Sequence, residues 1–135
     1  MWWALVAYAG DAEVANDAVA EAFVQALGRG DGLADPLAWI WRVAFRVAAG
    51  ELKRRRRIED RIPDVADPAE QRANELVSLL RQLPDNQRAA IVLHYYADRP
   101  VRDVAAALGV TSATARVHLH RGRRRLMQLL EDVDE

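Results

Sequence analysis

The sequence predicts an all-α fold of two small helical domains joined by a linker. Alanine and leucine are abundant, apolar residues recur at helical spacing, and no run of alternating β-branched residues occurs. Residues 62–68 carry two prolines and no periodicity, which is typical of a linker. A length of 135 residues suits one or two small domains. We therefore expect domains over residues 1–60 and 70–135, with a linker at 61–69.

The N-terminal domain is expected to contain a short apolar segment, residues 2–9, followed by two longer helices. Asp11 is a candidate N-cap for the first, which should end near Leu27, where glycines interrupt the pattern. Asp35 and Pro36 should begin the second, which runs into the basic residues 53–57. We expect Trp39 to lie in the core, and Trp41 to pack on the first helix or face solvent. The buried faces should hold Val14, Ala18 and Ala22, with Val19 and Phe23, in the first helix, and Leu37, Ile40, Ala44 and Val47 in the second.

The C-terminal domain is expected to contain four helices, over residues 70–83, 84–96, 100–108 and about 112–130. Prolines precede the second and third helices, Gly109 should close the third, and Thr111 or Ser112 should cap the fourth. The apolar segment from Ile91 to Leu93, together with Tyr95 and Tyr96, is interpreted as core.

The last two helices have the layout of a helix-turn-helix, because only three residues separate a short helix from one rich in arginine. The inner stripe of the second helix should consist of Ala115, Leu119, Gly122 and Leu126. On the opposite stripe, arginine can bind a guanine edge and Val117 a thymine methyl, whereas Arg123 to Arg125 are better placed for phosphates. His118 and His120 have the alternative interpretation of ordinary solvated positions.

The net charge of −1 conceals a segregation of charges along the chain. Residues 42–61 and 99–125 are basic, and acidic stretches surround them. Two basic blocks suggest two contact surfaces for a polyanion, although solvated helix faces are a common alternative. The basic run at 53–57 is accordingly expected either to follow duplex phosphates or to extend a helix end.

Several classes of protein are disfavoured. The chain has no cysteine, and its three histidines lack metal-site spacing, so neither a disulfide scaffold nor a metal centre is expected. No catalytic constellation or phosphate loop occurs, so we expect neither an enzyme nor a cofactor. No segment approaches the roughly 18 apolar residues of a membrane span, and no signal peptide is present, so the cytosol is the expected compartment.

The chain resembles the extracytoplasmic-function sigma factors over nearly its whole length. Residues 83–96, 101–111 and 114–123 are similar to the fourth region of that family, which reads the minus-thirty-five promoter element. Residues 10–23 are similar to the helix that docks on the RNA polymerase clamp, and residues 38–44 to the segment that melts the minus-ten element. The two halves occur in the family's order, so the resemblance implies a sigma factor with core RNA polymerase and promoter DNA as partners and an anti-sigma factor as a candidate partner.

The departures from the family pattern concern promoter opening. Arg46 stands where the family usually has an asparagine, Gly50 where it has an aspartate, and Ala20 where it has a glutamine. Met1 also starts late relative to the family, so the first helix is expected to be truncated, leaving Trp2, Trp3 and Leu5 with less packing surface.

Two functions follow as alternatives: a sigma factor that directs polymerase to promoters, or a sigma-like DNA-binding or sequestering regulator that cannot open them. On either interpretation Asp17 and Glu21 are expected to face the polymerase. The residues expected to contact DNA are Arg46, Lys53, Arg54, Arg55 and Arg56 in the N-terminal half, and Ser112, Thr114, Arg116, Val117, His118, His120, Arg121 and Arg124 in the C-terminal half.

Overall fold

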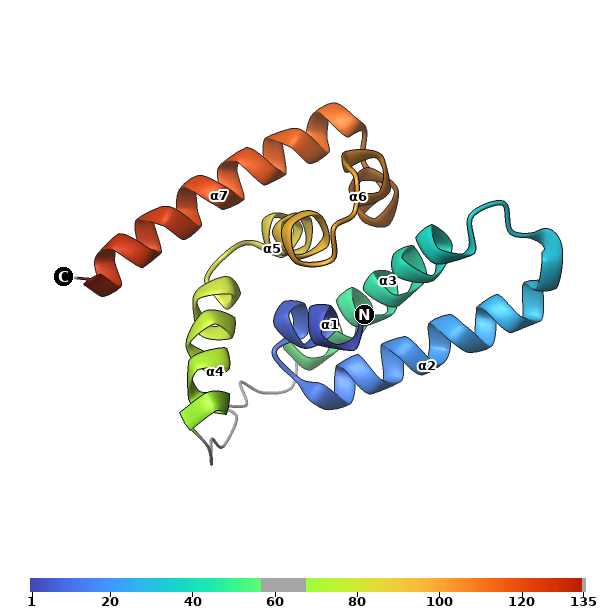
Figure 1. The fold of residues 1–135 in the computed structure, drawn as a ribbon, viewed down its shortest axis with the longest axis horizontal. Coiled ribbons are helices and arrows are strands. Elements are labelled where there is room, and N and C mark those ends of the chain that lie inside the picture. The colour runs from blue at the N-terminus through green and yellow to red at the C-terminus, as the bar shows by residue number, and fades with distance from the viewer. Residues whose placement is uncertain (57–67, 135) are drawn as a thin grey trace.

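The computed structural model describes residues 1–56 and 68–134, and within these ranges every regular element is a helix (Figure 1). The predicted all-α fold is therefore confirmed. The elements are α1 (Trp2–Ala9), α2 (Ala12–Arg29), the short 3₁₀ helix η1 (Gly30–Gly32), α3 (Pro36–Arg56), α4 (Pro68–Arg81), α5 (Asp85–Ile91), the π-helical turn η2 (Val92–Tyr96), α6 (Val101–Leu108) and α7 (Ser112–Asp134).

The expected caps define the helix ends. The Asp11 carboxylate accepts hydrogen bonds from the N–H groups of Glu13 and Val14, at 2.8 and 3.2 Å, and so caps α2. The Asp35 carboxylate accepts from the N–H of Ala38 at 3.1 Å and caps α3 in the same way. Gly109 ends α6 with a φ of 68°, a left-handed conformation that glycine adopts at little cost.

Several boundaries differ from the prediction. Helix α4 begins at Pro68, because proline is accepted in the first helical turn, so residues 68 and 69 of the predicted linker belong to it. The rest of that linker lies outside the described residues. Helix α7 continues past residue 130 to Asp134.

The N-terminal half, α1 to α3, buries most of the expected face of α2: Val14, Ala18 and Ala22 are buried and Val19 is half-buried. The expectation for Phe23 was wrong, because its side chain is 48% exposed at the edge of that face. On α3, Ile40 and Ala44 are buried and Val47 is half-buried. Leu37, however, is 53% exposed, because the first turn of α3 follows the η1 loop and lies beyond the part of the helix that is packed.

The expectation that Trp39 lies in the core was wrong, and for Trp41 the solvent-facing alternative is excluded. Trp41 is buried, with its ring 6.1 Å from that of Phe45, whereas Trp39 is only half-buried. The guanidinium of Arg29 lies 5.3 Å from the Trp39 ring centroid and covers its outer side. Two residues correspond to about 200° of helical rotation, so only one of the two rings can point fully into the core. In α1, Leu5 is fully buried, contrary to expectation, while Trp3 is exposed.

The C-terminal half confirms the inner stripe of the helix-turn-helix. Ala115, Leu119 and Gly122 are buried, and Leu126 is half-buried. Gly122 lies where α7 crosses α5: a Cβ there would be 3.0 Å from Ile91 Cγ1 and 3.2 Å from the Gln87 carbonyl oxygen. The absence of a side chain at this position therefore allows the two helices to approach closely.

The expectation that Tyr95 and Tyr96 belong to the core was wrong. Their side chains are 49% and 59% exposed, although Ile91, Val92 and Leu93 are buried as expected. Helix α5 changes at Val92 into the π-helical turn η2, whose wider spacing alters the direction of the following side chains. The two tyrosines consequently lie outside the stripe that the preceding residues bury.

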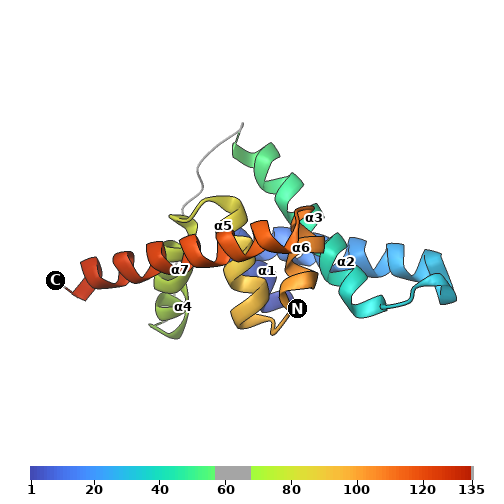
Figure 2. The ribbon, with the colours of Figure 1, turned by 90° about the horizontal axis from the view of Figure 1, so that it is seen from above.

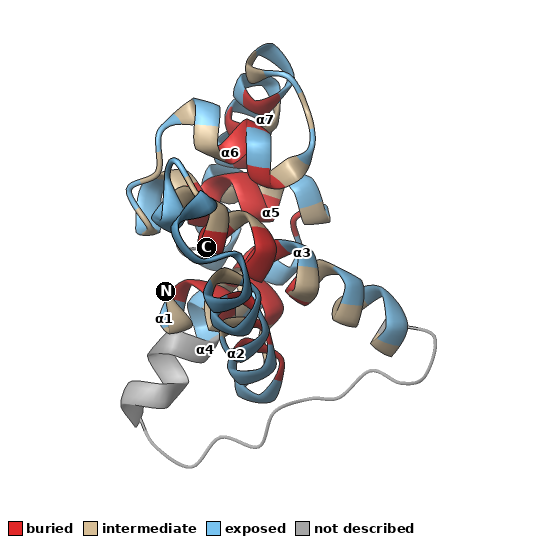
Figure 3. Cartoon of the chain, turned by 90° about the vertical axis from the view of Figure 1, so that its right-hand side faces the viewer, coloured by how far each residue is buried: buried red, intermediate tan, exposed pale blue. Residues whose placement is uncertain are grey.

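The two halves pack against each other around a continuous core (Figures 2 and 3). Helix α1 contacts α2, α3, α4 and η2, and α3 contacts α6. Arg88 of α5, 3% exposed, lies at this junction with its guanidinium carbon 5.0 Å from the ring centroid of Tyr8 in α1. The same guanidinium donates to the Leu83 carbonyl at 3.2 Å and to the Asp85 carboxylate at 3.0 Å. Over residues 1–56 and 68–134, no helix is both long enough and apolar enough to cross a membrane.

The close helix crossing gives a stability prediction. Replacing Gly122 with alanine should lower the free energy of unfolding, because a steric cost of about 1–3 kcal/mol exceeds the roughly 1 kcal/mol gained in helix propensity. Gly50→Ala is the matched control: it is also helical, but its Cβ would meet no atom within 4 Å. That variant should gain about 0.5–1 kcal/mol. Urea unfolding of both variants checks this, and a Gly122→Ala protein at least as stable as Gly50→Ala would refute the tight crossing.

Candidate nucleic-acid interface

The N-terminal half of α7 forms the centre of the candidate site. Thr114, Arg116, Val117, His120 and Arg124 are all exposed, on the side of the helix opposite the buried stripe. The Thr111 hydroxyl caps the helix by accepting from the N–H of Thr114 at 3.2 Å, and it also lies 3.0 Å from the Thr114 hydroxyl. An exposed helix face with hydroxyl, guanidinium and methyl groups has the donors and apolar contacts needed to read base edges in a major groove.

Three of the predicted site residues lie nearer the edges of this face. Ser112 begins α7 and is half-buried, and His118 is half-buried as well. Arg121 is exposed but lines a cavity together with His118. Position 118 is two residues, or about 200°, from position 120, so the two histidines cannot face the same way. The structure thus separates His120, on the outward face, from His118, beside the cavity.

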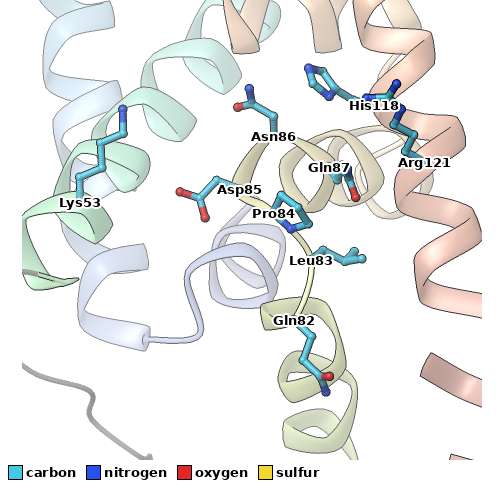
Figure 4. A pocket seen from close by; sticks show the side chains of 9 residues that line it. All are labelled: Lys53, Gln82, Leu83, Pro84, Asp85, Asn86, Gln87, His118 and Arg121. Atoms are coloured by element: carbon cyan, nitrogen blue, oxygen red, sulfur yellow. The ribbon is translucent and has the colours of Figure 1, made fainter. Parts of the chain in front are cut away.

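The cavity is an open cleft of about 690 Å³ that lies between α3, the α4–α5 connection with the start of α5, and α7 (Figure 4). It brings together predicted DNA-binding residues from both halves of the chain: Lys53 on one side, and His118 and Arg121 on the other. The carboxylate of Asp85 lies between them. The remaining lining residues are Gln82, Leu83, Pro84, Asn86 and Gln87.

The basic end of α3 separates into exposed and ion-paired residues. Lys53 is exposed, and Arg54 is largely exposed although it pairs with Glu51 at 2.7 Å. Arg55 is held by three carboxylates: Asp11 at 2.5 Å, Glu51 at 3.2 Å and Glu13 at 3.6 Å. Hydrogen bonds from Arg54 and Arg55 lower the pKa of the Glu51 carboxyl.

Arg55 therefore connects the C-terminal end of α3 to the start of α2, and its guanidinium is already engaged within the chain. Sequence reasoning missed this role, since a run of five basic residues does not say which one turns inward. Of the others, Arg56 ends α3 but its side chain is outside the described residues. Arg46 is exposed, two turns before Lys53 on the same helix.

Asp17 and Glu21 are exposed on α2, one turn apart, as the docking prediction requires. Glu21 accepts a hydrogen bond from Gln25 at 2.8 Å. Further along α2, the side chains of Phe23, Val24 and Leu27 are also exposed, and Val24 continues the stripe of the two acids. Sequence reasoning missed this apolar surface, although the i, i+4, i+7 spacing of 17, 21 and 24 could have indicated it.

Comparison with known proteins agrees with this arrangement. Residues 73–126 match the family described as Sigma-70, region 4. An RNA polymerase sigma-E factor from Streptomyces avermitilis is 34% identical, covering 89% of this chain and 73% of the relative. The RNA polymerase sigma factor CarQ from Myxococcus xanthus is 27% identical, covering 90% and 80%.

Two solved structures share the fold. The sigma factor RpoE from Bartonella quintana, in complex with the anti-sigma factor NepR, superposes with a TM-score of 0.78 at 21% identity, covering 95% of this chain and 88% of that one. CnrH, in complex with the cytosolic domain of CnrY, gives a TM-score of 0.74 at 23% identity, covering 99% and 82%.

The fold, the helix-turn-helix with its exposed basic face, and a sigma-factor relative aligned over most of both chains lead to one conclusion. This chain belongs to the extracytoplasmic-function family of RNA polymerase sigma factors, the subunits that direct core polymerase to specific promoters.

Proposed function

We propose that α7 reads the minus-thirty-five element and α3 holds the minus-ten element, while α2 docks on core polymerase. The observation that carries this proposal is the two-sided character of α7. Ala115, Leu119 and Gly122 fix its inner side against the domain, and its outer side presents Arg116 and Val117 to solvent. A rigidly packed helix with an exposed reading face is what entry into a major groove requires.

On α7 the division of labour follows side-chain chemistry. The guanidinium groups of Arg116 and Arg121 can each donate two parallel hydrogen bonds to a guanine edge, and Val117 can contact a thymine methyl. Arg124 lies farther along the helix, where its charge suits a phosphate. Thr114 and Ser112, near the helix N-terminus, suit backbone contacts.

On α3 we assign Arg46 to the separated strand of the minus-ten element, and Lys53 and Arg54 to the phosphates of the adjoining duplex. Arginine carries a fixed charge and only donors, whereas asparagine can both donate and accept. Arg46 therefore suits a phosphate better than the edge of an extruded base. We leave Arg55 out of this set, because three carboxylates already surround it.

We also propose that the two halves separate on the promoter. The two elements lie about 25 base pairs apart, which is about 85 Å along B-DNA. In the structure, Lys53 of one half and Arg121 of the other line the same cavity. Both elements cannot be occupied at once in this closed arrangement.

The partners proposed are core RNA polymerase, promoter DNA and an anti-sigma factor, in the bacterial cytoplasm. Support for the last partner comes from the similar structure of the Bartonella quintana sigma factor RpoE, which is a complex with the anti-sigma factor NepR. A second candidate function is a regulator that binds promoters without opening them. The specific observation in its favour is Arg46, which occupies the place of the family's usual asparagine.

The docking surface can be tested by charge reversal. The double variant Asp17→Lys, Glu21→Lys should weaken binding to core polymerase by about tenfold or more, since complementary charge steers association. Binding to a minus-thirty-five duplex should change less. The matched control is Asp31→Lys, an exposed acid beyond the end of α2. Equal losses in the two assays, or no loss in either, would refute docking through this stripe.

Promoter opening tests the proposed function as a whole. With core polymerase, the protein should form open complexes and tolerate base changes in the minus-ten element. Arg46→Asn should narrow that base preference and make binding less dependent on salt, because one phosphate contact is lost. Open-complex formation across minus-ten variants at two salt concentrations measures both effects. Failure of the wild-type protein to open any promoter would favour the second candidate function.

A further inference from the structure

An exposed tyrosine and an exposed arginine are joined beside the reading face of α7. Arg123 donates from Nη1 to the Tyr95 hydroxyl oxygen at 2.6 Å. Its guanidinium carbon lies 6.0 Å from the Tyr95 ring centroid. The two residues are 28 positions apart in sequence, so this contact joins η2 to α7.

The ring of Tyr95 is itself held in place by its neighbour His94. The His94 ring meets the Tyr95 ring edge-on, with their centroids 4.9 Å apart. His94 Nδ1 lies 2.9 Å from the carbonyl oxygen of Arg99, which anchors the imidazole to the start of the next segment. The π-helical turn thus directs a phenol outward and holds it in one orientation, and such turns occur frequently at functional sites.

The position of Arg123 on α7 relates the pair to DNA. Arg116, His120 and Arg123 are spaced i, i+4, i+7 and therefore lie along one edge of the helix. They span about 10 Å at a rise of 1.5 Å per residue. All three are exposed. This edge faces η2, whereas Arg121 lies toward the cavity on the other side.

We propose that Tyr95 and Arg123 form a clamp for a backbone phosphate of the DNA strand that borders the minus-thirty-five element. This proposal rests on the proposed reading of that element by α7. Arg123 uses one N–H on the phenol oxygen, so its other N–H groups can bind a phosphate oxygen. The phenol oxygen accepts that bond, which leaves its own hydrogen to be donated to the same phosphate. Tyr95 is then a positioning residue as well as a donor, since its ring orders the long arginine side chain.

If the pair binds a phosphate, substitutions in it should lower DNA affinity in a particular pattern. Arg123→Gln should weaken binding to every duplex by about tenfold. It should also reduce by about one the magnitude of the salt slope, which is the slope of the logarithm of the binding constant against the logarithm of salt concentration. Tyr95→Phe keeps the ring but removes the hydroxyl, so it should weaken binding by a few fold with the slope nearly unchanged. The double variant should lose less than the two single losses combined, because the residues act as a unit. Base preference should be unaffected in all three.

The experiment measures equilibrium binding of the full chain to a duplex that the wild-type chain has selected from a randomised pool, at several salt concentrations. Arg29→Gln is the control for loss of one charge, since Arg29 lies at the end of α2 and packs on Trp39. It should leave affinity and slope unchanged. Urea unfolding of the Tyr95 and Arg123 variants verifies that each is folded.

Two failures are distinguishable. If the wild-type chain selects no sequence, the proposed function fails, and the clamp fails with it. If the wild type selects a sequence and Arg123→Gln matches Arg29→Gln in affinity and slope, the clamp alone is overturned. Altered base preference in Arg123→Gln would also overturn it, because a phosphate contact carries no base information.

Discussion

The buried guanidinium of Arg88 lies where the two halves of the chain meet, and the closed arrangement depends on how it is satisfied. A charge this far from water is costly unless it is paired and hydrogen-bonded. Arg88 receives those partners from its own segment, through the Leu83 carbonyl and the Asp85 carboxylate, and from the other half, through the face of Tyr8. Separating the halves would remove the aromatic face, so the junction has an electrostatic component in addition to its apolar contacts.

Two consequences for DNA binding follow from this junction. The basic end of α3 and one edge of α7 are brought to a common cavity, where Lys53 and Arg121 face the same space. The outward face of α7 stays accessible, so the closed form can present the proposed minus-thirty-five reader alone. On the proposed assignment, binding to the minus-thirty-five element alone needs no rearrangement of the chain. Binding to both promoter elements needs the two halves to separate.

Local signals in the sequence were sufficient for most of the fold. Asp11, Asp35 and Gly109 act as caps through their own backbone chemistry, and the stripe through Ala115 and Gly122 follows from helical spacing alone. The exposed reading face on α7 was predictable for the same reason. The individual DNA and polymerase roles of these residues remain predictions, because surface position does not identify a bound partner.

What sequence reasoning missed depends on contacts between segments or on an irregular backbone turn. The three carboxylates around Arg55 come partly from α2. Which of Trp39 and Trp41 is buried depends on which side of α3 faces the helices packed against it, chiefly α2. The π-helical turn that exposes Tyr95 leaves no mark in the apolar pattern, since Ile91 to Tyr96 are apolar or aromatic apart from His94. Even where the helices are predicted correctly, one irregular turn can therefore move a side chain from the core to the exposed surface.

Separation of the halves on a promoter is tested most directly by a distance measurement. The chain has no cysteine, so Asp31→Cys and Gln128→Cys, both at exposed positions in different halves and outside the proposed docking stripe, allow two spin labels to be attached selectively. Pulsed electron paramagnetic resonance should give a single distance for the free protein. With core polymerase and a promoter carrying both elements, that distance should increase by more than about 20 Å, given about 85 Å between the elements. An unchanged distance in a complex that forms open promoters would contradict the proposed separation.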